Sequence, residues 1–288
     1  MKSSYQKKTS LPGILRVVMV LLFAIADLGG SAFAADGNPA MVGVSTSWLG
    51  RAIADVAGDS VSVTCISPPG TCPGHFDMKP GDFEKLRQCQ VLFRFDFQSS
   101  LDEKLAAISD DGIRVISVPA PEGLCVPERY LKSCLWMGDE LARLYPEKKP
   151  LFDERAKMAG DRLTSLGVEL RANITNAGLK GTRVVASGHQ AEFCKWLGLE
   201  VVATYSGGEA ASPAELTKLV DGGRSAGVRY VITNLQEGRQ MGEALAYHLE
   251  AKTVVFSNFP DDTGARNTFD GLVRDNVSNL LKAGMGQK

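Results

Sequence analysis

Apolar residues along the chain occur in short uninterrupted runs, separated by stretches in which apolar positions recur every three or four residues. The runs are rich in β-branched residues, which is typical of strands buried on both faces, whereas the spaced pattern predicts helices with one apolar face. In the first half of the chain we predict strands at 41–46, 60–67, 90–95 and 113–119. The helices predicted between them cover 48–58, 79–89 and 101–110.

The second half of the chain repeats this alternation. The predicted strands are 183–187, 200–205, 229–234 and 253–258. The predicted helices are approximately 190–197, 213–226, 239–250 and 268–283. Strands that alternate with helices form parallel sheets through right-handed crossovers. Each half is therefore predicted to be a four-stranded lobe with helices on both faces.

The segment between the halves, 127–177, carries no strand pattern. Its second part has apolar residues close to a 3.6-residue period, which predicts one helix of about 27 residues and about 40 Å. The fold class that we predict is α/β, with two doubly covered parallel-sheet lobes, a long rigid connecting helix and a ligand cleft between the lobes. The predicted boundaries are 1–34 for a signal peptide, 35–126 for the N-terminal α/β lobe, 127–180 for the helical connector and 181–288 for the C-terminal α/β lobe.

The first 34 residues have the pattern of a cleaved secretory signal. Basic residues precede a short apolar run, VVMVLLFAIA, and Ala32-Phe33-Ala34 supplies a small-residue cleavage site. This apolar run is shorter than the roughly 20 residues that span a bilayer, although an uncleaved membrane anchor stays an alternative. We therefore expect an exported protein.

The overall composition limits the class of partner. The chain has 32 Lys and Arg residues against 33 Asp and Glu residues, so it lacks the basic excess that nucleic-acid binding requires. Its hydrophobic content of 44% is too high for a disordered chain. We expect a soluble monomer that does not bind nucleic acid.

Polar side chains follow the ends of the predicted strands. They are His75, Arg94, Asp96 and Glu122 in the first half, and His189, Glu192, Asn234, Gln236, Glu237 and Asn258 in the second. Open α/β sheets bind ligands beyond the carboxyl ends of their strands, so these groups should converge on the cleft. Imidazole and carboxylate together are typical ligands of zinc or a similar divalent ion. Structural roles stay open, as a helix cap for His75, as packing for His189 and as an ion pair for Arg94.

Six cysteines are spread along the chain without a C-x-x-C motif, which excludes a thioredoxin-like site and a zinc ribbon. An even number in an exported chain permits disulfides, but Cys89 and Cys194 lie in apolar segments that suit buried free thiols. Cys72 and Cys125 lie on loops that should border the cleft. We predict that these two are close in space, either as a disulfide or as soft ligands.

Several segments, in order, resemble one family. They are VSVTCISPPGTCPGHFDMKPGDFEKLRQCQVLF, LARLYPEKKPLFDERA, SGHQAEFCKWLGLEVVATY, SPAELTKLV and VVFSNFPDDTGARNTFDGLVRDNVSNLLKAG. Together they resemble the periplasmic solute-binding proteins of zinc and manganese ABC importers, over nearly the whole chain after the signal peptide. The resemblance implies the two-lobe fold, a metal site in the cleft and a role in transport.

The resemblance also assigns ligand positions. His75 lies one residue beyond the position of the family's first histidine, and Glu122 falls near the second. His189 falls near the third histidine, and Asn258 falls near the last ligand, which is a carboxylate in the family. The implied metal ligands are therefore His75, Glu122, His189 and Asn258. Other candidate cleft residues are Cys72, Arg94, Asp96, Cys125 and Glu192.

We therefore expect a solute-binding protein, not an enzyme, that captures zinc or manganese as the transported ligand and passes it to the membrane permease of an ABC importer. A binding protein of the same fold for an anionic or chelated ligand stays an alternative, with Arg94 and Arg129 as recognition residues. A metal-dependent periplasmic hydrolase with Glu122 or Glu192 as general base is the last alternative. It is disfavoured because the chain has no H-E-x-x-H or G-x-S-x-G motif.

Overall fold

The computed structural model describes residues 40–68, 71, 76, 78–106, 113–207, 212–262 and 264–285. All of them belong to one compact unit, Pro39–Lys288. The predicted signal peptide lies outside the described residues. None of the helices in the described part of the chain is long and apolar enough to cross a membrane.

The first sheet has four parallel strands in the order β2-β1-β3-β4. Its strands are β1 (Ala40–Val44), β2 (Val61–Cys65), β3 (Val91–Phe95) and β4 (Arg114–Val118). The connections contain α2 (Ser47–Ala57), η2 (Gly58–Ser60), α3 (Pro80–Leu86), η4 (Asp96–Gln98) and α4 (Ser100–Ala106). The central strand β3 is buried along its whole length, as its largely apolar sequence predicts.

The second sheet has the same topology, in the order β6-β5-β7-β8, again with parallel strands. Its strands are β5 (Arg183–Ser187), β6 (Glu200–Tyr205), β7 (Tyr230–Asn234) and β8 (Lys252–Phe256). The connections contain α7 (Gly188–Trp196), α8 (Pro213–Ala226), η6 (Leu235–Glu237), α9 (Gln240–Leu249) and η7 (Gly264–Asn267), and α10 (Phe269–Met285) closes the chain. In each sheet the strand order reverses beside the first strand, which is the position where open α/β sheets form their ligand crevice.

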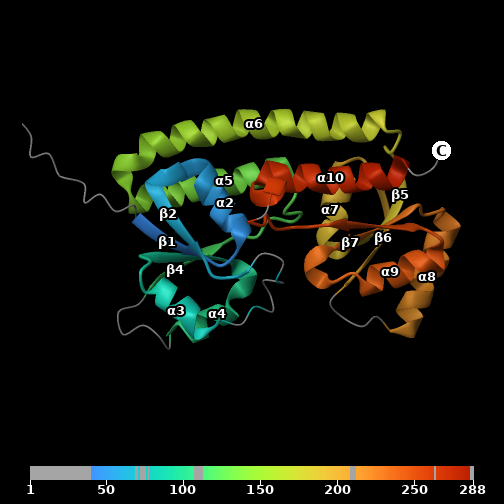
Figure 1. Ribbon diagram of the computed structural model, residues 1–288, viewed down its shortest axis with the longest axis horizontal. Helices are drawn as coiled ribbons and strands as arrows, with labels where there is room; N and C mark the ends of the chain where they lie inside the picture. Colours follow the sequence, from blue (N-terminus) through green and yellow to red (C-terminus); the bar gives the residue numbers. More distant parts are fainter. Residues whose placement is uncertain are drawn as a thin grey trace, which may run out of the picture. The chain divides into compact units, whose positions relative to one another are not determined.

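Two helices connect the sheets. They are α5 (Pro127–Leu144) and α6 (Lys149–Asn176), with the short turn η5 (Pro146–Lys148) between them. The 28 residues of α6 pack against α2 and α5 on one side of the connection and against α10 on the other, and Figure 1 shows α6 extending alongside α5 and α10. The long connecting helix is therefore present, at close to its predicted length.

One hydrophobic core continues from the first sheet, through the connecting helices, into the second sheet. It includes Phe93 of β3, Phe152 of α6 and Phe256 of β8. Tyr130 of α5 stacks on Phe269 of α10 with ring centroids 3.8 Å apart. Because separating the two halves would expose this apolar surface to water, the shared core resists large relative movements.

A partly buried ionic cluster supports the same connection. Arg162 of α6 pairs with Asp55 of α2, with 2.7 Å between Nη2 and Oδ2, and also with Asp270 of α10. The hydroxyl of Tyr130 donates a hydrogen bond to Asp55 over 2.8 Å. Arg162 thus holds together three helices that are far apart in sequence.

The predicted fold class is confirmed, since two parallel sheets are covered by helices and joined by a long helix. Element ends differ in places. The strand predicted at 253–258 ends at Phe256, so Asn258 lies beyond the strand. The helix predicted at 79–89 covers only Pro80–Leu86.

Candidate functional site

A cavity of about 670 Å³ lies beyond the carboxyl ends of strands from both sheets. The first sheet contributes the lining residues Phe97, Ala120, Pro121, Glu122, Gly123 and Leu124. The second contributes Gly188, His189, Ala191, Glu192, Asn234, Gln236, Asn258 and Phe259. Its volume lies within the range of about 300–1,000 Å³ that is usual for small-ligand sites. The cleft that the sequence predicts is therefore present.

The loop after β4 brings Glu122 to this cavity. Its neighbour Gly123 has a left-handed backbone (φ +69°), and a Cβ at this position would lie 2.8 Å from Cβ of Glu192. Only glycine lets the loop approach α7 this closely. The carbonyl of Glu122 also accepts a hydrogen bond from Arg129 of α5, which holds the loop in place.

His189 reaches the cavity from the first turn of α7. Ser187, the last residue of β5, caps this helix, and its Oγ accepts a hydrogen bond from His189 N over 3.3 Å. The imidazole is 62% exposed, and its Nε2 lies 3.6 Å from Oε1 of Glu237. The cap therefore fixes the backbone while the ring stays open to solvent.

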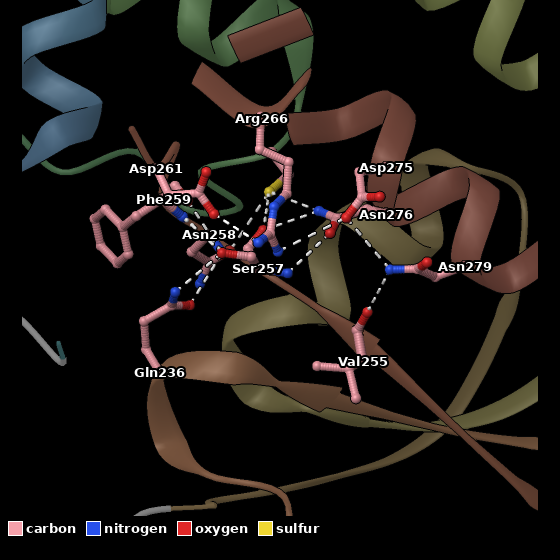
Figure 2. Close-up of polar contacts among 11 residues, drawn as sticks. Gln236, Val255, Ser257, Asn258, Phe259, Asp261, Arg266, Asp275, Asn276 and Asn279 are labelled. Carbon is pink, nitrogen blue, oxygen red and sulfur yellow. Dashed lines mark hydrogen bonds and ion pairs between the residues drawn. The ribbon is translucent and has the colours of Figure 1, made fainter. Parts of the chain in front are cut away.

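Buried amides lie beneath the cavity. Gln190 donates from Nε2 to Oδ1 of Asn234 (3.1 Å) and to Oδ1 of Asn258 (3.0 Å). Asn258 N donates to Oε1 of Gln236 over 3.1 Å. Figure 2 shows Gln236 and Asn258 beside Ser257. The backbone N–H of Ser257 donates a hydrogen bond to the side chain of Asn276 of α10, and its carbonyl accepts one from the same side chain. The floor of the cavity is thus polar but uncharged.

Two carboxylates line the cavity, Glu122 and Glu192, and cations pair with Glu192. Its carboxylate accepts hydrogen bonds from Lys195 and Arg129, both over 2.9 Å. These two bonds, with Lys195 the stronger influence, hold the pKa of Glu192 below its usual range. Because two cations already compensate this carboxylate, it contributes little free negative charge to the cavity.

Three of the candidate cleft residues do not line the cavity. Arg94 is only 6% exposed and pairs with Asp102 of α4, because its position on β3 directs it toward that helix. Asp96 accepts hydrogen bonds from the backbone of Phe97 and Ala120 instead of facing the cavity. Its role is to join the ends of β3 and β4.

The third, Cys125, lies below the amide floor and is fully buried. Its thiol is within 3.2 Å of the Ser257 carbonyl and 3.5 Å of Oδ1 of Asn258. Burial raises the pKa of this thiol well above its usual range, so it stays protonated and is a poor metal ligand. Cys125 is a free thiol, which contradicts the predicted disulfide with Cys72. Cys125 points inward because it packs in the hydrophobic core.

Two predicted residues, Cys72 and His75, lie outside the described residues. The other five cysteines are all free thiols. In the part of the chain that the structure describes, no group of three His, Cys, Asp or Glu side chains is placed to hold a metal ion. The structure does bring together Glu122, His189 and Asn258, three of the four predicted ligands, at one cavity.

The sequence did not single out Gln190. It is completely buried and joins the ends of β7 and β8 through Asn234 and Asn258. Its position in the first turn of a helix after a strand was the only available signal. That signal does not reveal which partners a side chain meets, because both partners come from other parts of the chain.

Comparison with known proteins identifies the family. A sequence profile described as "ZnuA: Zinc-uptake complex component A periplasmic" matches residues 42–283, which include both sheets and the connecting helices. The chain belongs to this family. The matched range includes every residue that lines the cavity, so the cavity lies within the part of this family member that the family profile covers. No curated protein matches the chain in sequence.

Solved structures are similar to this family member in fold at low sequence identity. The periplasmic zinc-binding protein TroA from Treponema pallidum is 16% identical, with a TM-score of 0.71 over 86% of this chain and 99% of that chain. The solute-binding protein FpvC from Pseudomonas aeruginosa, in complex with Mn²⁺, is 18% identical, with a TM-score of 0.73 over 87% and 100%. A zinc-bound ZnuA with residues 138–173 deleted is 17% identical, with a TM-score of 0.71 over 86% and 98%.

Proposed function

We propose that this protein is a periplasmic receptor that captures a divalent metal ion, zinc or manganese, in the cavity between its two sheets. It delivers the ion to the membrane permease of an ABC importer and acts as a monomer without catalytic activity. The signal peptide predicted at 1–34 directs it to the periplasm. The ion is its cargo and not a resident cofactor.

The observation that carries this proposal is the cavity itself. Donor groups from both halves line it, with Glu122 from the first half and His189 and Asn258 from the second. An ion held by both halves would link them through its coordination bonds. Family membership favours such a cargo, as do the zinc and manganese ions named for similar structures.

The proposed ligands are His75 and Glu122 from one half and His189 and Asn258 from the other. His75 lies outside the described residues and stays a prediction. Ligand nitrogens must be unprotonated to bind, so we expect metal affinity to fall as the pH is lowered through the histidine range. Such a site would release its ion on acidification.

Metal analysis of the exported protein, purified without chelator, tests the function directly. We expect bound zinc or manganese, and isothermal titration of the stripped protein should detect binding of one or both ions. The variant His189→Ala should weaken binding by at least the roughly 10–100-fold that follows loss of a supporting group around a metal. His75→Ala should have a similar effect.

His248 provides the control for these variants. It lies on α9 with an exposed side chain, and its backbone carbonyl accepts hydrogen bonds from Arg224. His248→Ala should therefore leave metal affinity unchanged. Wild-type protein that carries no metal and binds neither ion would refute the proposed function.

A further inference from the structure

Glu237 is a buried carboxylate beside His189 of the cavity wall, and it is not among the four proposed ligands. It follows β7, and its side chain is only 7% exposed. Its Oε2 accepts a hydrogen bond from the Ser187 hydroxyl at the end of β5, and its Oε1 accepts one from Gly207 N, just after β6, over 3.2 Å. Three neighbouring strand ends of the second sheet thus fix the orientation of this carboxylate.

Among the described residues, no lysine or arginine pairs with the carboxylate of Glu237. Within that part of the chain, the ion-pairing group beside it is the imidazole of His189. Glu192, in contrast, is compensated by Lys195 and Arg129. Burying an uncompensated carboxylate is unfavourable, so a cation beside Glu237 would stabilise it.

The distance between the two side chains fits a shared ion. The 3.6 Å between His189 Nε2 and Glu237 Oε1 is longer than the 2.7–2.9 Å of a charge-assisted hydrogen bond. Zinc–nitrogen and zinc–oxygen bonds of about 2.0–2.2 Å at a tetrahedral angle separate the two donor atoms by about 3.4 Å. The pair is therefore spaced as two ligands of one ion.

Asn258 is less suited to this role. The side-chain oxygens of Asn258 and Glu237 all accept hydrogen bonds, so the two residues differ in charge and not in occupancy. An amide oxygen is neutral and cannot offset the charge of a divalent ion. The contacts of Asn258 make it part of the cavity floor.

We propose that His189 Nε2 and Glu237 Oε1 chelate the captured ion together, and that Asn258 supports the floor instead of binding the ion. This inference rests on the proposed function and revises one of its ligands. The hydrogen bonds from Ser187 and Gly207 orient the ligating carboxylate, as hydrogen bonds commonly do around metal sites. Water and groups from the first half complete the coordination.

Isothermal titration with Zn²⁺ and Mn²⁺ compares three variants with the wild type. Glu237→Gln keeps the shape of the side chain but removes its charge, and it should weaken binding at least roughly 10–100-fold. Asn258→Ala should weaken binding less than Glu237→Gln does, because it removes a neutral group of the cavity floor and no charge. Glu243→Gln, on the exposed face of α9 and paired with Arg239, is the matched control and should bind as the wild type does.

Nitrogen NMR of the wild type loaded with Zn²⁺ gives an independent readout. The chain has only three histidines, and the His248→Ala and His189→Ala variants assign their signals. We expect His189 to be metal-bound at Nε2 and protonated at Nδ1. If Glu237→Gln does not fold, as judged by thermal unfolding, Glu237→Asp takes its place in the titration and should also weaken binding, because the shorter side chain moves the carboxylate away from His189.

The outcomes separate the two proposals. Wild-type protein that binds neither ion refutes the proposed function. Wild-type protein that binds metal overturns the present inference alone if Glu237→Gln binds equally well, if Asn258→Ala abolishes binding, or if His189 is metal-bound at Nδ1.

Discussion

Gly242, in the first turn of α9, should not tolerate even one added methyl group. A Cβ at this position would lie 2.0 Å from Cγ2 of Thr233 and 2.6 Å from the hydroxyl of Tyr205. Normal contacts between such atoms are about 3.5–4.0 Å. Thr233 is completely buried in the centre of the second sheet, so it has no free space into which to move. Gly242→Ala must therefore displace α9 or distort β7.

The cost follows from two opposing effects. Overpacking in a core costs about 1–3 kcal/mol, and two simultaneous overlaps put this site at or above the upper end. Replacing glycine by alanine within a helix returns about 1 kcal/mol. We expect a net loss of about 2 kcal/mol in the free energy of unfolding, which for a chain of this size lowers Tm by roughly 4–8 °C.

Two glycines of α8 provide matched controls for urea unfolding followed by circular dichroism and tryptophan fluorescence. A Cβ at Gly222 would meet no atom within 4 Å, so Gly222→Ala should stabilise the protein by up to about 1 kcal/mol. At Gly223 the nearest atom is a methyl of Leu249, at 2.7 Å, which can rotate away. Gly223→Ala should thus lie between the other two variants.

A second substitution tests the mechanism. Thr233→Ser removes the methyl that overlaps most and should recover part of the stability lost in Gly242→Ala, beyond the sum of the two single effects. If Gly242→Ala is as stable as the wild type, or gains as much as Gly222→Ala, then α9 and β7 do not pack this closely and the reasoning is refuted.

Two further predictions concern stability. Arg162→Met should lower the free energy of unfolding, measured in urea, by about 1–2 kcal/mol, because it leaves the carboxylates of Asp55 and Asp270 without their cation at a partly exposed site. An unchanged urea midpoint would contradict this. Burial raises the pKa of Cys125 and Cys194, so the folded thiols stay protonated where unfolded thiols ionise. The free energy of unfolding should therefore fall above pH 9 by up to about 1.4 kcal/mol per thiol per pH unit, and it should fall less steeply in Cys194→Ala. A free energy of unfolding that stays constant up to pH 10 would refute this explanation.

The sequence alone was sufficient to predict the architecture. Short, largely apolar runs such as 90–95 are typical of strands that are covered on both faces, so their alternation with helical patterns predicted two parallel sheets. The 28-residue helix α6 followed from its apolar period without turn signals. The helix predicted at 213–226 is α8, which begins with a reciprocal cap between Ser212 and Glu215. These features depend on residues close in sequence.

The composition of the cavity was decided by tertiary structure. Side chains of a strand alternate between faces, so Arg94 turns to Asp102 although it stands at a strand end like the residues that line the cavity. Cys125 turns inward to Ser257, 132 positions away in sequence. Sequence pattern places a residue near a strand end, but the pleat, the loop path and the partners from distant segments determine where its side chain points. For that reason Glu122, His189 and Asn258 meet at one cavity, whereas Glu237 became a candidate ligand only when Ser187 and Gly207 were seen to hold it beside His189.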